Sequence, residues 1–400
     1  MKLVIKMYGV VLEGGGLKGG YHLGAMKAIF ECGYDIGGYV GTSIGSFNAA
    51  VLAQGDFNKL YDAWYNGSSA LGFDINEREV GKLIDKKMNF KSIKYWATFV
   101  KDNIANKGVD SSKLKELYSS YIDEEKLRKS NVDYGMVTVS LSDMKPIYMY
   151  KEDIPKGQIS SYVLASSYLP MFKQDNILLD SKMYLDGGFV DNRPFSLLID
   201  KGYKDIIEIR TNAIGVTKRV DKKGLNVITI EPSKKLLSGI AISDNKSVRN
   251  DMEMGYYDAL RILKGYIGKK YYVIPMGEDK VFKAFINLSD ESIQEVIEKV
   301  KMSGIIENME PKKVLFEKIL ANISAKLKGM DTLSYERLVV SMIEYVLEDE
   351  QDEYKLFTFE ELFNEFKQKI PKYMRKQREA LIKDPTEILI LNLLKNLEIC

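Results

Sequence analysis

Apolar residues near the start of the chain fall into short runs separated by segments with helical spacing. Residues 8–12 and 37–40 are short and partly apolar, as buried strands are. The segment between them predicts a helix that ends at Gly33, because glycine is favoured just after a helix C-terminus. Residues 46–53 predict a second helix directly after the second strand. This order of strand, helix, strand and helix indicates an α/β fold with a mainly parallel central sheet.

The same alternation returns after a less regular, mostly helical stretch from about residue 56 to residue 130. Residues 135–141 and 145–150 predict the two strands of a hairpin, and residues 182–185 predict a short strand. The other predicted elements are helices near 160–165, 195–201 and 248–266, and strands at 205–209, 226–230 and 271–274. We therefore expect a three-layer α/β/α domain over residues 1–280.

The pattern changes after Pro275. Beyond about Phe285 only helical periodicity is found, with helix stops expected at Gly304, Pro311, Gly329, Pro371 and Pro385. These residues indicate an all-helical extension over residues 281–400, without strands and without a recognisable site.

Two lysine-rich segments bear on membrane contact. Residues 91–101 interleave aromatic residues with lysines, which is typical of an interfacial helix or lid and also of an amphipathic helix packed on the sheet. A window of the helical extension without acidic residues suits either anionic lipid or a solvated helix face. Its basic members are Lys367, Lys369, Lys372, Arg375, Lys376 and Arg378. Peripheral contact with a membrane surface therefore stays open.

Composition and charge narrow the classes of protein. The chain has 400 residues, 45% of them hydrophobic, and a net charge of +2, which gives no reason to expect a nucleic-acid partner. Two distant cysteines, Cys32 and Cys400, predict no disulfide framework and fit a reducing cytosol. Lys6 interrupts the N-terminal apolar run, unlike a signal peptide, and no run reaches the ~20 apolar residues of a membrane span. We expect a cytoplasmic protein.

A G-x-S-x-G pattern stands at Gly41, Ser43 and Gly45, between the second predicted strand and its helix. Strand, sharp turn and helix are the context of a nucleophile elbow, where a strained turn exposes the serine hydroxyl. The two glycines let strand and helix pass closely, and the helix N-terminus stabilises developing negative charge. Because so short a pattern also occurs by chance, the partners available to the serine decide its meaning.

The serine needs a base, and histidine is the usual one. His22, the single histidine, stands in the first predicted helix, ahead of the serine, and is better interpreted as a packed or solvent-facing helical residue. It also leaves no basis for a histidine metal site. A buried carboxylate with a raised pKa can replace histidine. Asp186 is the candidate, at the end of a predicted strand and followed by Gly187 and Gly188, although an ordinary Asp-Gly turn has the same sequence.

A glycine-rich segment supplies candidate anion-binding amides. Gly14, Gly15 and Gly16 lie between the first predicted strand and helix, with Lys18 adding positive charge. Such amides suit a tetrahedral oxyanion or a phosphate. Gly14, Gly16 and Gly19 also fit a dinucleotide fingerprint, but the acidic residue that should end the second strand is absent, which disfavours that interpretation.

Four segments thus follow one another in a fixed order, at residues 14–19, 41–45, 165–170 and 186–188. Together they resemble the patatin-like phospholipase family over roughly the first 275 residues. The resemblance implies Ser43 as nucleophile and Asp186 as general base in a Ser–Asp dyad without histidine. It implies an oxyanion hole at Gly14, Gly15 and Gly16. It assigns supporting places to Lys18, Gly19, Gly41, Gly45, Gly187 and Gly188, and the motif's usual continuation is matched by Asn192 and Pro194.

By that resemblance the expected activity is hydrolysis of lipid acyl esters through an acyl-enzyme, without a cofactor or metal and therefore without calcium. The expected substrate is a phospholipid or another acyl ester. Two alternatives remain at this stage. One is a soluble carboxylesterase or thioesterase that uses the same dyad, and the other is a non-catalytic lipid-binding or scaffold protein. The sequence does not indicate an oligomeric state.

Overall fold

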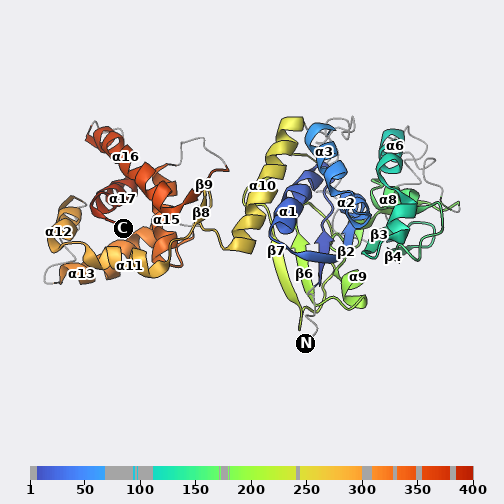
Figure 1. The fold of residues 1–400 in the computed structure, drawn as a ribbon, viewed down its shortest axis with the longest axis horizontal. Helices are drawn as coiled ribbons and strands as arrows, with labels where there is room; N and C mark the ends of the chain where they lie inside the picture. The colour runs from blue at the N-terminus through green and yellow to red at the C-terminus, as the bar shows by residue number, and fades with distance from the viewer. Residues whose placement is uncertain are drawn as a thin grey trace. The chain divides into compact units, whose positions relative to one another are not determined.

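The computed structural model describes residues 7–67, 93–94, 97, 111–170, 172, 179, 181–239, 244–299, 309–327, 331–347, 354–378 and 384–399. The chain divides into two compact units, residues 1–263 and 264–400, called unit 1 and unit 2 below (Figure 1). Most of the lysine-rich segment 91–101 lies outside the described residues.

Unit 1 contains a seven-stranded sheet in the order β4-β3-β2-β1-β6-β7, with β5 also paired to β3. Strands β1, β2, β3, β6 and β7 are parallel to their neighbours in this order, whereas β4 and β5 run antiparallel to β3. The predicted mainly parallel sheet is therefore confirmed. The strands are β1 Met7–Leu12, β2 Asp35–Thr42, β3 Asp133–Ser140, β4 Lys145–Tyr150, β5 Tyr184–Asp186, β6 Asp205–Ile209 and β7 Asn226–Ile230.

Helices cover both faces of this sheet. On one face α9 buries Leu197 and Leu198 in a cluster with Val137 of β3. Side chains alternate along a strand, so Tyr134 faces the other side, where its hydroxyl donates to the Ser46 carbonyl of α2 at 3.2 Å. The described helices of unit 1 are η1 Gly16–Gly19, α1 Gly20–Glu31, α2 Ile44–Ala53, α3 Phe57–Gly67, α6 Ser112–Tyr121, α7 Glu124–Lys129, α8 Ile159–Ser166, η4 Gly187–Phe189, α9 Phe195–Asp200 and α10 Asn245–Lys264, whose last residue is the first of unit 2.

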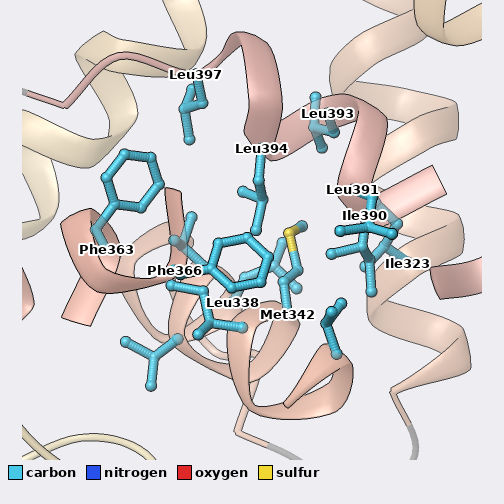
Figure 2. Packing of buried hydrophobic residues seen from close by; sticks show 14 of the residues in the cluster. Ile323, Leu338, Met342, Phe363, Phe366, Ile390, Leu391, Leu393, Leu394 and Leu397 are labelled. Atoms are coloured by element: carbon cyan, nitrogen blue, oxygen red, sulfur yellow. The ribbon is translucent and has the colours of Figure 1, made fainter. Parts of the chain in front are cut away.

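Unit 2 is a helical assembly with its own apolar core. Figure 2 shows Phe366 of α16, Leu338 and Met342 of α15, and Leu394 of α17 converging in one cluster. Its described helices are α11 Glu278–Asn287, α12 Asp290–Lys299, α13 Pro311–Val314, η5 Leu315–Leu320, α14 Ala321–Lys326, α15 Tyr335–Val346, α16 Phe359–Arg378 and α17 Pro385–Asn396. The helical character predicted for the C-terminal part is confirmed. Whether a catalytic domain ends at residue 280 stays a prediction.

Unit 2 also contains one pair of strands that the periodicity did not fully predict. β8, Tyr272–Ile274, was expected as a last strand, and it pairs in parallel with β9, Leu356–Thr358. The prediction of no strand after about residue 285 was therefore wrong. Three residues are too few to show an alternating pattern, and the partner of β9 lies far away in the sequence.

Pro371 does not end a helix, contrary to the sequence prediction. It lies inside α16, where it cannot donate a backbone hydrogen bond to the preceding turn. Phe366, Ile370 and Tyr373 around it are buried in the core of unit 2, and their packing offsets the lost bond. Pro385, which was also expected as a helix stop, instead opens α17 in the first turn, where a missing N–H costs nothing.

Two of the basic residues in the window of α16 make interactions within unit 2. The Lys367 ammonium donates to the carbonyls of Lys395 and Leu397 at 2.8 and 3.0 Å, and Lys369 pairs with Glu365 at 3.0 Å. Among the helices in the described ranges, none combines the length and the apolar character needed to cross a bilayer.

Two leucines of unit 2, one buried and one exposed, allow a test of how much burial contributes to stability. Leu394 is completely buried and Leu333 is 92% exposed. Leu394→Ala should lower the free energy of unfolding by about 2–5 kcal/mol, because it leaves a cavity among apolar side chains. Leu333→Ala should change it by less than about 0.5 kcal/mol. Urea unfolding followed by circular dichroism measures both, and equal losses would contradict the packing of Leu394.

Candidate active site

Ser43 stands between β2 and α2 in a strained backbone conformation. Its φ of 56° and ψ of −130° cost a residue other than glycine of order 1–3 kcal/mol. The turn is closed by the Ser43 carbonyl, which accepts hydrogen bonds from the backbone N–H groups of Ser46 and Phe47 at 2.8 and 3.3 Å and from the Ser46 hydroxyl at 2.6 Å. Strand, turn and helix thus present the serine side chain at the carboxyl end of β2.

The glycines on either side of Ser43 allow a close approach of backbone to backbone. A Cβ atom on Gly45 would lie 2.3 Å from the Leu12 carbonyl oxygen, and one on Gly41 would lie 2.3 Å from the Gly45 carbonyl. Any larger residue would push α2 away from β1 and β2. The elbow therefore needs glycine at both positions.

The pairing along β3 brings Asp186 to Ser43. Thr42, the last residue of β2, lies opposite Val137, and Asp186, the last residue of β5, lies opposite Thr138. Because β4 occupies the other edge of β3 at Thr138, β5 must share the edge that β2 uses. The ends of β2 and β5 therefore meet, and the residues that end them become neighbours.

The Ser43 side chain lies close enough to the Asp186 carboxylate to act on its pKa as a hydrogen-bond partner. Asp186 is only 5% exposed, and its Oδ1 also accepts the Gly188 N–H at 2.7 Å. Burial raises the pKa of Asp186 to about 6, against the opposing effect of the hydrogen bonds from Ser43 and Gly188. Such a carboxylate is ionised near neutral pH and basic enough to take up a proton.

Gly187 fits the junction where the two strand ends meet. A Cβ atom there would lie 2.2 Å from the Val137 carbonyl oxygen and 2.9 Å from the Thr42 side chain. At Gly188 a Cβ atom would meet the side chains of Asn192 and Asp186 at 3.0 and 3.1 Å. The first of the two glycines is thus the more tightly enclosed.

The glycine-rich segment after β1 lies beside Ser43. A Cβ atom on Gly14 would be 3.2 Å from the Ser43 Cβ, and the Gly14 N–H is directed to the Asn192 carbonyl at 3.4 Å. In the described ranges, the N–H groups of Gly15 and Gly16 donate to no protein acceptor. Both residues are partly exposed, so these two amides are available to a bound anion.

Residues that the sequence analysis did not single out hold this segment. The Thr211 hydroxyl donates to the Gly14 carbonyl at 2.7 Å, and the Thr211 N–H donates to the buried Glu13 carboxylate at 2.7 Å. Arg193 bridges Glu13 and the buried Glu208 at 3.7 and 2.5 Å. Thr211 closely follows the carboxyl end of β6, which pairs with β1. This position after a predicted strand is the feature of the sequence from which Thr211 could have been found.

Lys18 and Gly19 lie in η1 and face the helices behind the glycine-rich segment. The Lys18 charge counteracts the effect of burial, which raises the pKa of Asp251 in α10. The Gly19 carbonyl accepts a hydrogen bond from Asn48 of α2 at 3.0 Å. Both residues therefore connect the segment to its surroundings.

His22 is packed inside the protein. It is fully buried in α1, and its Nδ1 lies 3.2 Å from the Asn48 amide nitrogen. Burial lowers the pKa of His22 to about 3, so the imidazole is neutral at neutral pH. The described residues also contain no group of three or more His, Cys, Asp or Glu side chains placed to hold a metal ion.

Part of the chain matches a known protein family. Residues 10–199 match the family model "Patatin-like phospholipase". The chain therefore carries a patatin-like phospholipase domain, and all four segments described above lie within the match.

Two curated relatives match about half of this chain at low identity. The patatin-like phospholipase domain-containing protein ZK370.4 of Caenorhabditis elegans is 26% identical over 53% of this chain and 14% of its own length. Lysophospholipase NTE1 of Cryptococcus neoformans is 23% identical over 55% of this chain and 12% of its own length. The chain thus matches only a small part of these relatives.

Two solved structures align with most of the chain. VipD from Legionella pneumophila is 14% identical, with 98% of this chain and 92% of that chain covered and a TM-score of 0.38. The type III effector ExoU is 12% identical, with 97% and 77% covered and a TM-score of 0.34.

The burial of Asp186 predicts a pH-dependent stability. Its pKa rises from 3.8 to about 6 on folding, so the protonated form favours the folded state. This stabilisation is fully present below about pH 4 and is lost as the pH rises through about 6. Asp186→Asn cannot ionise and keeps the shape of the side chain. It should therefore raise the free energy of unfolding by about 1–3 kcal/mol at about pH 8 and by little at about pH 4.

Denaturant unfolding of wild type and Asp186→Asn at both pH values checks this expectation. A loss of stability in the variant that is the same at both pH values would contradict an ionised, buried carboxylate.

Proposed function

We propose that this protein hydrolyses lipid acyl esters, with Ser43 as nucleophile and Asp186 as general base. The observation that carries the proposal is the meeting of the ends of β2 and β5, which places Ser43 beside Asp186, a buried carboxylate whose pKa is raised to about 6. A serine hydroxyl is a weak nucleophile until a base within hydrogen-bond reach takes its proton. Asp186 stands within that reach, and His22 is buried against Asn48 instead.

In the proposed first step, Asp186 takes the Ser43 proton while the Ser43 oxygen attacks the carbonyl carbon of the ester. The resulting oxyanion accepts hydrogen bonds from the Gly15 and Gly16 N–H groups. Gly14 contributes through its position against Ser43, since its own N–H is directed to Asn192. The N-terminus of α2 behind Ser43 adds a favourable electrostatic contribution.

Collapse of this intermediate breaks the bond to the alcohol oxygen, which leaves with the proton held by Asp186. The fatty acyl group then remains on Ser43. Asp186 next accepts a proton from water as the water oxygen attacks the acyl carbon, and it returns that proton to the Ser43 oxygen as the fatty acid is released. These steps use only Ser43, Asp186, the glycine amides and water, so we expect the activity to persist without calcium.

The name of the fungal relative, a lysophospholipase, and the family description both support a lipid ester as the substrate. The alternative is an esterase that acts on short-chain esters. Unlike that esterase, a lipid acyl hydrolase should prefer long acyl chains presented in a lipid aggregate. Hydrolysis of phospholipid vesicles and of a short-chain ester by the same preparation separates the two substrate classes.

Loss of either dyad residue should abolish the chemistry. Ser43→Ala and Asp186→Asn are expected to lower ester hydrolysis by about 10³-fold or more, with excess chelator present throughout. Ser43→Ala should also lose covalent labelling by a fluorescent fluorophosphonate, because the labelled oxygen is gone. Ser120→Ala, which removes an exposed hydroxyl on α6, serves as the control and should keep both activities. A folded wild type that neither labels nor hydrolyses would sink the proposal.

The activity should also depend on the ionisation of Asp186. Only the ionised carboxylate accepts the Ser43 proton, and its pKa lies at about 6. The value of kcat/KM should therefore fall about tenfold per pH unit below that midpoint and level off above it. A profile of short-chain ester hydrolysis between about pH 4.5 and pH 8.5 measures this, and a flat profile through pH 6 would rule out Asp186 as the base.

A further inference from the structure

The end of α8 contacts the backbone of both residues of the proposed dyad. The Ser166 hydroxyl accepts a hydrogen bond from the Ser43 N–H at 2.9 Å. Two residues further on, the Tyr168 carbonyl accepts a hydrogen bond from the Asp186 N–H at 2.8 Å. One short segment of chain therefore holds the two backbones whose side chains meet.

The orientation of the Ser166 hydroxyl is fixed as well. It donates to the Val137 carbonyl at 2.6 Å, and the residue is completely buried. With its proton committed to Val137, its lone pairs are directed to the Ser43 N–H. Val137 is the residue of β3 that lies opposite Thr42, so Ser166 joins the register of the sheet to the turn that follows it.

Ser43 has a particular need for this bond. Its backbone is held at a φ of 56°, and a strained conformation persists only where the surroundings determine it from several directions. The carbonyl side of Ser43 is held by Ser46 and Phe47 of α2. Its amide side is held by Ser166.

We propose that Ser166 is a positioning residue, which sets the place of the Ser43 hydroxyl against Asp186 by holding the Ser43 amide. The inference rests on the proposed hydrolase function and adds a residue to which the mechanism above gives no role. It predicts that the Ser166 hydroxyl acts on the rate of the chemical step. A purely structural hydroxyl would change only the fraction of folded protein.

Ser130 offers a matched control within the same unit. Its hydroxyl donates to the Ala53 carbonyl at 2.6 Å and accepts the Val132 N–H at 3.1 Å, which is the bonding pattern of Ser166. These contacts lie at the C-terminal end of α2, the end opposite Ser43. Ser130→Ala therefore removes equivalent hydrogen bonds without touching the elbow.

The experiment compares wild type, Ser166→Ala and Ser130→Ala in fluorophosphonate labelling, with the second-order rate constant and the final labelled fraction measured separately. Ser166→Ala should reach the wild-type labelled fraction but with a rate constant lower by about 10–100-fold, as expected for a misplaced reacting group. Ser130→Ala should keep the wild-type rate. If Ser166→Ala does not fold, Ser166→Cys keeps the volume with a weaker acceptor and should show a smaller loss of rate in the same direction.

The pH profile gives a second, independent readout. If Ser43 moves away from Asp186, the carboxylate loses the hydrogen bond that lowers its pKa, so the midpoint of kcat/KM should shift to higher pH in Ser166→Ala and not in Ser130→Ala. A Ser166→Ala variant with the wild-type rate constant and midpoint would overturn the positioning role while leaving the hydrolase function intact. A folded wild type that does not label at all would instead overturn the hydrolase function itself.

Discussion

The edge of β3 is the constraint on which the candidate site depends. Two strands of opposite direction end there at consecutive register positions, β2 opposite Val137 and β5 opposite Thr138. Backbone hydrogen bonds fix this meeting point, and Ser43 and Asp186 are neighbours because they lie at the two strand ends. Gly187 allows the second strand end to pass the Val137 carbonyl, and Ser166 bonds to the same carbonyl while holding the Ser43 amide. The Val137 carbonyl thus lies next to both Gly187 and Ser166, the neighbours of Asp186 and Ser43.

The site carries free-energy costs that the rest of unit 1 offsets. Ser43 holds a backbone conformation unfavourable for any residue but glycine, and Asp186 keeps a carboxylate away from water. Around them stand the buried hydrogen bond from Thr211 to Gly14 and the partly buried Arg193 bridge between Glu13 and Glu208. The strained Ser43 and the desolvated Asp186 thus stand within a network of hydrogen bonds that holds them in place, as a preorganised active site requires.

The sequence predicted local features more accurately than features that depend on long-range contacts. The strands at 205–209 and 226–230 were predicted with the bounds that the structure has, because each is a compact run rich in β-branched apolar residues. β9 was missed and Pro371 was taken as a helix end, since both depend on partners distant in sequence. The site shows the same division. Its glycines, Ser43 and Asp186 were marked by motifs. Thr211 was indicated only by its position after a predicted strand. Ser166 stood in a motif, but nothing in the sequence indicated which groups it bonds.

The sequence by itself determined the alternation of strands and helices, the turn chemistry around Ser43 and Asp186, and the absence of a second histidine that would permit an ordinary triad. These are properties of local periodicity and residue type. Only the tertiary structure decided that β5 ends against β2, that Asp186 is buried enough for its pKa to rise to about 6, and that the Gly14 amide is directed to Asn192. Those outcomes arise from strand register and desolvation, which are set by residues distant in sequence and cannot be read from any one segment.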